Sequence, residues 1–337
     1  MMLRMGLALL VSLLIVLLMG PKFIPYMHKL HFGQTIYELG PQHKAKQGTP
    51  VMGGLMIAAG VIVSSIAFHP ISWGGAWEFM LPMILFAVFS MAVGFADDYI
   101  KAVKKRHEGL TPKQKIIGQV GSALAFSVYC YFSPKVGSRI YVPFTALEWD
   151  LGIFYIPLMT LVIIFMVNSS NLQDGLDGLL STVTAVSMPG WAAIAFAMGM
   201  IHTEMQQDYL NCATFALAFT GAVMGFLRYN RYPAKIFMGD TGSMFIGGGV
   251  VAISMMLRQP MLMILLSICP IMSSVSVILQ RLYFKATHGK RIFRMSPIHH
   301  HFELCGYSET QIVAMYGTIT GVATIIAVLS VFGGLLG

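Results

Sequence analysis

The run LRMGLALLVSLLIVLLMG, from Leu3 to Gly20, decides the fold of this chain. It is close to the roughly 20 residues that a helix needs to cross the hydrocarbon core of a bilayer. It lacks a small-residue cleavage site and continues into Pro21 and Lys22, so it is interpreted as a retained span rather than a secretion signal. We therefore expect a membrane protein.

Similar apolar runs follow along the 337 residues. Hydrophobic residues make up 56% of the chain and charged residues only 11%, against about a quarter in a soluble domain. The runs do not alternate apolar and polar residues, and only helices or closed barrels satisfy their backbone in lipid. We predict an all-α polytopic membrane protein, one integral membrane domain over residues 1–337, with about ten transmembrane helices. The expected spans are residues 3–20, 51–68, 80–96, 116–132, 153–167, 179–199, 211–227, 240–257, 261–280 and 311–335.

The basic residues are distributed unevenly over the loops between these runs. Most of the 22 lie in the first, third, seventh and ninth loops. Because Lys and Arg are enriched on the cytoplasmic side, these loops are predicted to face the cytoplasm, and an even number of spans places both termini outside. The formal charge of +8 thus indicates orientation and not a nucleic-acid partner. The residues concerned are Lys22, Lys29, Lys44, Lys46, Lys101, Lys104, Lys105, Arg106, Lys113, Lys115, Arg228, Arg231, Lys235, Arg281, Lys285, Lys290, Arg291 and Arg294.

The four cysteines show no CxxC or other paired spacing, so we expect core thiols and neither a disulfide nor a metal site. They are Cys130, Cys212, Cys269 and Cys305.

Four polar motifs fall on the predicted cytoplasmic side, as one active site would require. They are GFADDY with Asp97 and Asp98, NSSNLQDGLDGL from Asn168 to Leu179, FMGDTGS from Phe237 to Ser243, and SPIHHHFE from Ser296 to Glu303.

The first two motifs carry paired acids. Asp97 and Asp98 are adjacent and repel each other, which favours a bound cation or one carboxylate that is ready to accept a proton. A solvated helix end is the alternative. Asp174 and Asp177 would share a face of a helix, and the alternative for them is a glycine-rich turn with acids at a helix N-terminus.

The third and fourth motifs suit anions. Glycines and hydroxyls around Asp240 at a helix N-terminus predict an anion site to which the acid can bring Mg²⁺, with a simple capped turn as the alternative. Three adjacent histidines cannot all point to one side, so they make a poor single-metal site. Histidine suits phosphate oxygens, and with Lys290, Arg291 and Arg294 upstream the ninth loop is interpreted as an anion-binding arm.

Acids for magnesium, cations for phosphate and an adjoining apolar bundle together indicate phosphoryl transfer at a membrane surface, with a lipid as one substrate.

These motifs carry a resemblance. GPKFIP, GQTIYELGP, KQGTPVMGG, GFADDY, GLTPKQK, NSSNLQDGLDGL, RYNRYPAKIFMGDTGS and SPIHHHFELCG occur in family order and spacing over nearly the whole chain. The chain resembles the phospho-N-acetylmuramoyl-pentapeptide transferases, a branch of the polyprenyl-phosphate sugar-1-phosphate transferases.

The resemblance implies a ten-helix homodimer of the bacterial cytoplasmic (inner) membrane. It also implies a Mg²⁺-dependent reaction in which UDP-MurNAc-pentapeptide and undecaprenyl phosphate give lipid I and UMP, a step of peptidoglycan synthesis and hence of cell-wall growth, cell shape and division.

The resemblance further implies roles for single residues. Those expected to be catalytic are Asp97, Asp98, Asp174, Asp240 and His299, with Asp98 favoured as the base and with Asp174 and Asp240 as metal ligands. Those expected to contact substrate are Lys46, Thr49, Lys115, Asn168, Asn171, Leu172, Asp177, Phe237, Gly239, Ser243, Gln280, His299, His300 and His301. Within this set Phe237 would stack on uracil, and the lysines would neutralise phosphate charge.

Two prolines lie inside apolar runs, Pro157 in the fifth and Pro270 in the ninth, and are expected to bend those helices. A bend in the ninth is expected to open a lateral groove for the polyprenyl chain, although a kink that serves packing alone is the alternative.

Several alternatives stay open. The lipid phosphate could attack the nucleotide directly, or an aspartate could attack first and form a covalent intermediate. A transferase for a UDP-N-acetylhexosamine would keep the acids and change the sugar. A cation transporter is the alternative from another class, but its acids should lie near the middle of the membrane.

Overall fold

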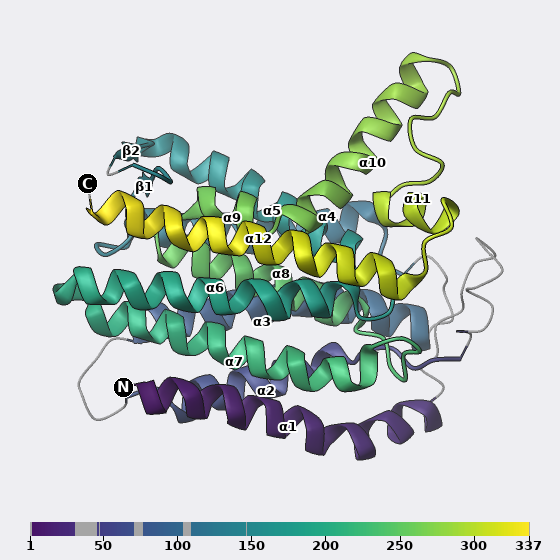
Figure 1. Ribbon diagram of the computed structural model, residues 1–337, viewed down its shortest axis with the longest axis horizontal. Helices are drawn as coiled ribbons and strands as arrows, with labels where there is room; N and C mark the ends of the chain where they lie inside the picture. The colour runs from purple at the N-terminus through teal and green to yellow at the C-terminus, as the bar shows by residue number, and fades with distance from the viewer. Residues whose placement is uncertain are drawn as a thin grey trace.

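A computed structural model describes residues 2–30, 46, 48–70, 77–103, 109–145 and 147–336. Long α-helices run side by side along one axis of the molecule (Figure 1). In chain order the elements are α1 (Met2–Lys29), α2 (Gly54–Ala67), α3 (Trp77–Val103), α4 (Pro112–Phe132), β1 (Arg139–Tyr141), β2 (Glu148–Asp150), η3 (Gly152–Phe154), α5 (Tyr155–Gln173), α6 (Leu179–Ile201), η4 (Thr203–Met205), α7 (Gln206–Asn230), α8 (Gly239–Met256), η5 (Pro260–Leu262), α9 (Met263–Leu266), α10 (Ile268–Ala286), α11 (Ile298–Leu304) and α12 (Glu309–Leu336).

The predicted all-α membrane architecture is confirmed. Each predicted span overlaps a helix, and the ninth overlaps the broken pair α9 and α10. Six of the described helices are long and apolar enough to cross a bilayer, or seven if the broken pair counts as one span. The prediction of ten spans therefore rests on shorter or more polar helices as well, such as α2 with 14 residues. The number of spans and the outward termini remain predictions.

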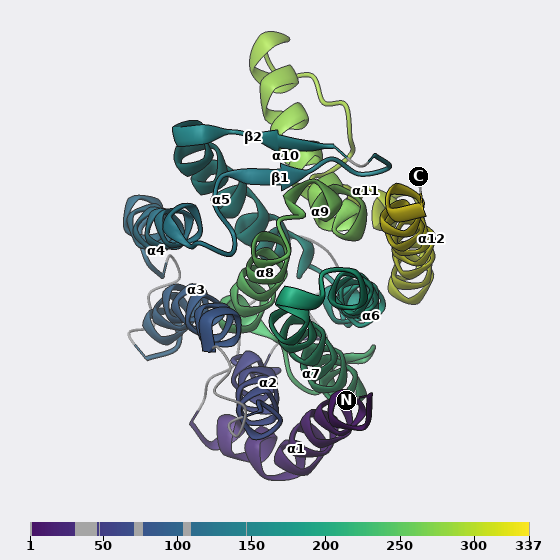
Figure 2. The ribbon, with the colours of Figure 1, turned by 90° about the vertical axis from the view of Figure 1, so that its left-hand side faces the viewer.

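Helix α8 is the central helix of the bundle, with α3, α5, α6 and α7 around it (Figure 2). Its residues from Thr241 to Met256 are all buried. Three consecutive glycines let other helices approach it closely: Gly247 lies against α5, Gly248 against Ser90 of α3, and Gly249 against the Phe219 ring of α7. Small residues are the usual means of close helix packing in membranes. The sequence of α8 thus fixes the relative positions of its neighbours.

The ninth span is broken, as predicted. The segments Pro260–Leu266 and Ile268–Ala286 meet at 86°, and α10 projects obliquely from the bundle (Figure 1). Pro270 has no N–H to donate to the carbonyl of Leu266, so the helix loses a hydrogen bond at the break. Pro157 is likewise the third residue of its helix, α5, yet Gly152–Gln173 forms a single span without a break of this size, so a proline at this position does not by itself break a span.

Outside the helices, β1 and β2 form an antiparallel pair in which Ile140 lies opposite Trp149. This hairpin belongs to a loop, so the all-α class holds.

The four cysteines are free. Cys130, Cys212 and Cys269 are buried, as expected for core thiols, whereas Cys305 is exposed because it ends the short helix α11.

The predicted loop residues Lys44, Lys104, Lys105 and Arg106, and the motif GQTIYELGP, lie outside the described residues.

Candidate active site

Three carboxylates meet where α3 ends and α8 begins. Asp97 and Asp98 lie in the last turns of α3, and Asp240 is the second residue of α8. One oxygen of each lies within 4.8 Å of the others, the one such group of potential metal ligands in the described part of the chain. The helices can approach because Gly94 of α3 lies against the Asp240 carbonyl. We call Asp97, Asp98 and Asp240 the acid cluster.

Asp98 caps α8 from a distant part of the sequence. Its Oδ1 accepts from the Asp240 N–H at 3.2 Å. Its Oδ2 accepts from the Thr241 N–H at 2.9 Å and from the Thr241 hydroxyl at 2.6 Å. A carboxylate at a helix N-terminus satisfies free N–H groups and is favoured by the helix dipole. Asp98 therefore holds the start of α8 in place.

Lysines neutralise the rest of the acid cluster. Lys101 Nζ lies 2.5 Å from Asp97 Oδ2 and 3.5 Å from Asp240 Oδ2, and Lys115 Nζ lies 2.7 Å from Asp240 Oδ2. The remaining Asp97 oxygen accepts from the Leu110 N–H at 2.8 Å. Because Lys101 is 42% exposed, its ammonium group has room to move toward an incoming anion.

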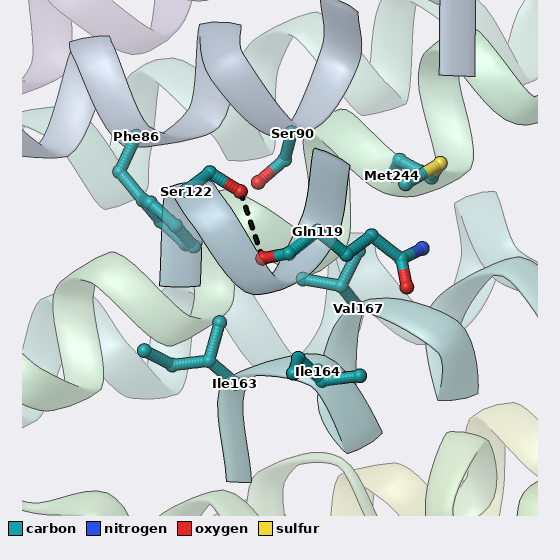
Figure 3. A pocket seen from close by; sticks show the side chains of 8 residues that line it. All are labelled: Phe86, Ser90, Gln119, Ser122, Ile163, Ile164, Val167 and Met244. Atoms are coloured by element: carbon teal, nitrogen blue, oxygen red, sulfur yellow. Dashed lines mark hydrogen bonds between the residues drawn. The ribbon is translucent and has the colours of Figure 1, made fainter. Parts of the chain in front are cut away.

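The two asparagines of the second motif, Asn168 and Asn171, have different hydrogen-bond partners. Asn171 Nδ2 donates to Asp240 Oδ1 at 2.7 Å and to Ser243 Oγ at 2.9 Å, so both residues adjoin the acid cluster. Asn168 pairs instead with the Gln119 side chain of α4, at 2.8 Å. Gln119 also lines a small pocket between α3, α4, α5 and α8 (Figure 3). Among the described residues, Asn168 therefore bonds to α4 and not to the acid cluster.

Asp174 lies in the turn between α5 and α6. Burial, together with the charges of Asp240 and Asp98, raises the pKa of its carboxyl to about 8. It was predicted as a metal ligand, but it is not one of the three acids of the cluster. A cation at this place would favour its ionised form.

A second charged group adjoins this turn. Lys46 Nζ lies 2.8 Å from Asp177 Oδ1 and 2.7 Å from Glu309 Oε2, and Asp177 Oδ2 accepts from the Ala234 N–H at 2.9 Å. Burial alone would lower the pKa of Lys46, but its hydrogen bonds to the two carboxylates raise it. We call Lys46, Asp177 and Glu309 the lysine network.

The three histidines point in different directions, as their spacing predicted. The His299 ring is fully buried and lies against Gly175. Neither of its nitrogens has a hydrogen-bond partner among the described residues, and burial with the adjacent His300 lowers its pKa well below the usual value. His300 Nδ1 lies 2.5 Å from Glu303 Oε2, whereas His301 Nδ1 accepts from the Arg294 N–H at 3.1 Å.

The buried, unbonded nitrogens of His299 are unusual, because buried polar atoms nearly always have a partner. A substrate oxygen or a water molecule would satisfy them. His299 is therefore the histidine best placed to bind a ligand.

Gln280 holds the backbone of the loop after α10. Its side-chain oxygen accepts from the N–H groups of Ile292 and Phe293 at 3.0 Å each, and its nitrogen donates to the Phe293 carbonyl. The expected contact of Gln280 with substrate stays a prediction.

The segment around Phe237 is held by the first loop. The Phe237 N–H donates to the Pro50 carbonyl at 2.8 Å, and its carbonyl accepts from the Gly53 N–H at 2.9 Å. Gly239 has a positive φ of 73°, and a Cβ there would approach Asp98 Oδ2.

Two further predicted residues lie near these segments. Thr49 belongs to the same first loop, and its N–H donates to the Lys46 carbonyl at 3.2 Å. Leu172 is half-buried near the end of α5.

Comparison with known proteins gives the family. The family model for glycosyl transferase family 4 matches residues 80–258. The phospho-N-acetylmuramoyl-pentapeptide-transferase of Listeria innocua serovar 6a is 42% identical over 322 residues, covering 95% of each chain. Those of Clostridium novyi (42% over 322 residues) and Halalkalibacterium halodurans (41% over 314 residues) cover 95% and 93% of each chain.

The chain belongs to the phospho-N-acetylmuramoyl-pentapeptide-transferase family. The predicted family and the predicted transferase activity are thereby confirmed. The family match begins in α3 and ends just after α8, so it contains the whole acid cluster, whereas Lys46 and Glu309 lie outside it.

The sequence reasoning missed three residues of the site: Lys101, Gln119 and Glu309. Lys101 lies four residues after Asp97, so helical spacing could have found it. The others meet the site through contacts between distant segments, which no local pattern indicates.

Proposed function

We propose that this protein transfers phospho-MurNAc-pentapeptide from UDP-MurNAc-pentapeptide to undecaprenyl phosphate in the bacterial cytoplasmic membrane, giving lipid I and UMP in peptidoglycan synthesis. The observation that carries the proposal is the meeting of three acids and two lysines where α3 ends and α4 and α8 begin. Phosphoryl transfer needs such a site, because its catalysis consists mainly of positioning and charge neutralisation.

The acid cluster fits Mg²⁺. Carboxylate oxygens are the ligands that this ion prefers, and Asp97, Asp98 and Asp240 present theirs within 4.8 Å of one another. Asp240 would be the principal ligand, with Asp174 close enough to be influenced by the same charge. When bound, the ion would neutralise the diphosphate of the donor.

We propose Asp97 rather than Asp98 as the base for the lipid phosphate. Both acids have their oxygens engaged, but Asp97 Oδ2 is held by the partly exposed ammonium group of Lys101, which can move away, whereas the Asp98 oxygens accept from the start of α8. A lipid phosphate oxygen would form a new bond to the phosphorus that carries the sugar. The bond from that phosphorus to the oxygen of the leaving UMP would break, and UMP would keep the electron pair. Lys101 and Lys115 would move from the acids toward the phosphates.

The donor would lie between the acid cluster and the lysine network. Phe237 would stack on the uracil, with Asp177, Gly239 and Leu172 near the nucleoside. The unbonded nitrogens of His299 and the ring of His300 would contact the sugar and the phosphates.

The polyprenyl chain would lie along α10. This helix leaves the bundle at the 86° break, and it exposes large apolar side chains that suit a lipid tail. They are Val275, Ile278, Leu279, Leu282, Tyr283 and Phe284. A homodimer with outward termini completes the proposal.

The test is UMP release by detergent-purified protein with undecaprenyl phosphate and Mg²⁺, comparing UDP-MurNAc-pentapeptide with UDP-GlcNAc. We expect release only with the muramoyl donor and none after chelation by EDTA. Release with UDP-GlcNAc alone would place the protein among the hexosamine transferases, and release with neither donor from folded protein would refute the proposed reaction.

A further inference from the structure

Glu309 is a buried acid that no sequence motif indicated. It is the first residue of α12, and its backbone position is fixed by a capping box: the Ser308 N–H donates to Gln311 Oε1 at 2.9 Å, and the Gln311 N–H donates to Ser308 Oγ at 3.3 Å. An acid in the first turn of a helix is favoured by the helix dipole. The side chain is therefore held both by its own helix and by its partners.

Its carboxylate joins two parts of the donor site. Oε2 accepts from Lys46 Nζ at 2.7 Å and from the Asp177 N–H at 3.1 Å. The Glu309 side chain is 3% exposed and that of Lys46 is 12% exposed, so the ammonium group keeps a small accessible face. One oxygen of Glu309 thus fixes both a cation and the backbone of the turn that carries Asp174 and Asp177.

The charges explain why two acids are needed. A buried ammonium group is costly unless it is paired and fully hydrogen-bonded. Asp177 can give Lys46 only one oxygen, because its other oxygen accepts from the Ala234 N–H. Glu309 supplies the second acceptor. Without it, the Lys46 ammonium group would be held by a single carboxylate oxygen and would be less well oriented.

We propose that Glu309 is a positioning residue for the nucleotide donor, which acts by holding Lys46 and the Asp177 backbone in their binding geometry. This inference rests on the proposed function. In the described part of the chain, Glu309 bonds to Lys46 and to the Asp177 backbone and to no member of the acid cluster, so its effect belongs to the donor and not to the lipid acceptor.

The experiment uses the full-length protein with each substrate varied in turn. Glu309→Gln keeps the shape and removes the charge. We expect the KM for UDP-MurNAc-pentapeptide to rise about tenfold, while kcat and the KM for undecaprenyl phosphate stay within about twofold. Glu148→Gln is the matched control. Glu148 also pairs with a cation, Arg258, but it belongs to β2 and not to the lysine network.

A double-variant comparison separates positioning from simple support of the fold. If Glu309 acts through Lys46, the Glu309→Gln change should raise the donor KM much less in a Lys46→Gln background than in the wild type. A full tenfold rise in that background would overturn the inference. So would an unchanged donor KM, or equal rises in the KM of both substrates.

Should Glu309→Gln fail to fold, Glu309→Asp carries the test. Its shorter carboxylate keeps the charge, and we expect a donor KM raised about threefold; an unchanged KM would overturn the inference. Wild-type protein that releases no UMP from the muramoyl donor would refute the proposed function itself. Active wild type with an unaffected Glu309→Gln variant would refute only the role of Glu309.

Discussion

At the scale of single residues, Asp97 and Asp98 show how neighbours in sequence acquire different environments. Asp98 accepts three hydrogen bonds from the start of α8. Asp97 contacts Lys101 and the Leu110 N–H, neither of which belongs to α8. The adjacent acids were expected to share a site, and they do, but only Asp98 also caps α8.

Because only Asp98 caps α8, replacing Asp97 and replacing Asp98 should affect stability differently. Asp97→Ala should lower turnover at least 100-fold and leave the unfolding temperature nearly unchanged. Asp98→Ala should lose turnover and also about 1–2 kcal/mol of stability, as for a lost helix cap, which lowers the unfolding temperature by about 1–3 °C in a chain of this length. UMP release and thermal unfolding in detergent measure both effects. Equal unfolding temperatures for the two variants would contradict the capping role.

A pH prediction follows from His299. Its pKa is lowered in the folded protein by burial, so folding favours the neutral ring. The stabilising contribution is present above the unfolded pKa of about 6.5 and is lost as pH falls through that value toward the lower folded pKa. The unfolding temperature of wild type should therefore fall more between pH 7.5 and 5.5 than that of His299→Gln.

The control for that comparison is His288→Gln, which removes an exposed histidine after α10. It should follow the wild type over the same pH range. A His299→Gln variant with the same pH dependence as the wild type would show that the buried ring does not resist protonation.

At the scale of elements, the glycines explain why the site assembles. Gly54 of α2 lies directly against the backbone of Gly242 in α8. The Gly53 and Gly54 N–H groups also donate to the carbonyls of Phe237 and Met238. The GTPVMGG motif is thus the surface on which the start of α8 rests.

We predict that Gly54→Ala is strongly destabilising, by about 2 kcal/mol or more. Its Cβ would overlap the Gly242 backbone, which cannot turn aside as a side chain could. Gly121→Ala in α4 is the control, since no atom lies within 4 Å of a Cβ there. Yield of folded protein and unfolding temperature measure the effect, and equal behaviour of the two variants would contradict the packing argument.

The helices themselves could be predicted from the sequence, because an apolar run of the right length leaves the backbone few alternatives in lipid. The acid cluster was also foreseen from its motifs. Glu309 and the pairing of Gln119 with Asn168 were not, since they depend on which helices become neighbours.

At the scale of the whole molecule, both chain ends lie at one end of the bundle, and α11 lies at the other (Figure 1). This arrangement agrees with an even number of crossings. It leaves the direction of the bundle in the membrane as a prediction from the charges of the loops.

Cys305 can test that direction, because it is the exposed cysteine and the other three are buried. A membrane-impermeant maleimide should label it in inverted vesicles and not in intact spheroplasts. Cys305→Ser removes this signal, and adding Glu204→Cys, an exposed position in η4, should restore labelling in spheroplasts only. The reverse pattern would invert the predicted topology.

The position of the chain ends also bears on protein engineering. Helix α1 begins at Met2 and α12 ends at Leu336, both at the end of the bundle opposite α11. A fluorescent protein or purification tag at either terminus would therefore lie at the opposite end of the bundle from the histidines. Two copies could then be joined in tandem by a flexible linker, and each copy could be inactivated separately to ask whether one working subunit is enough.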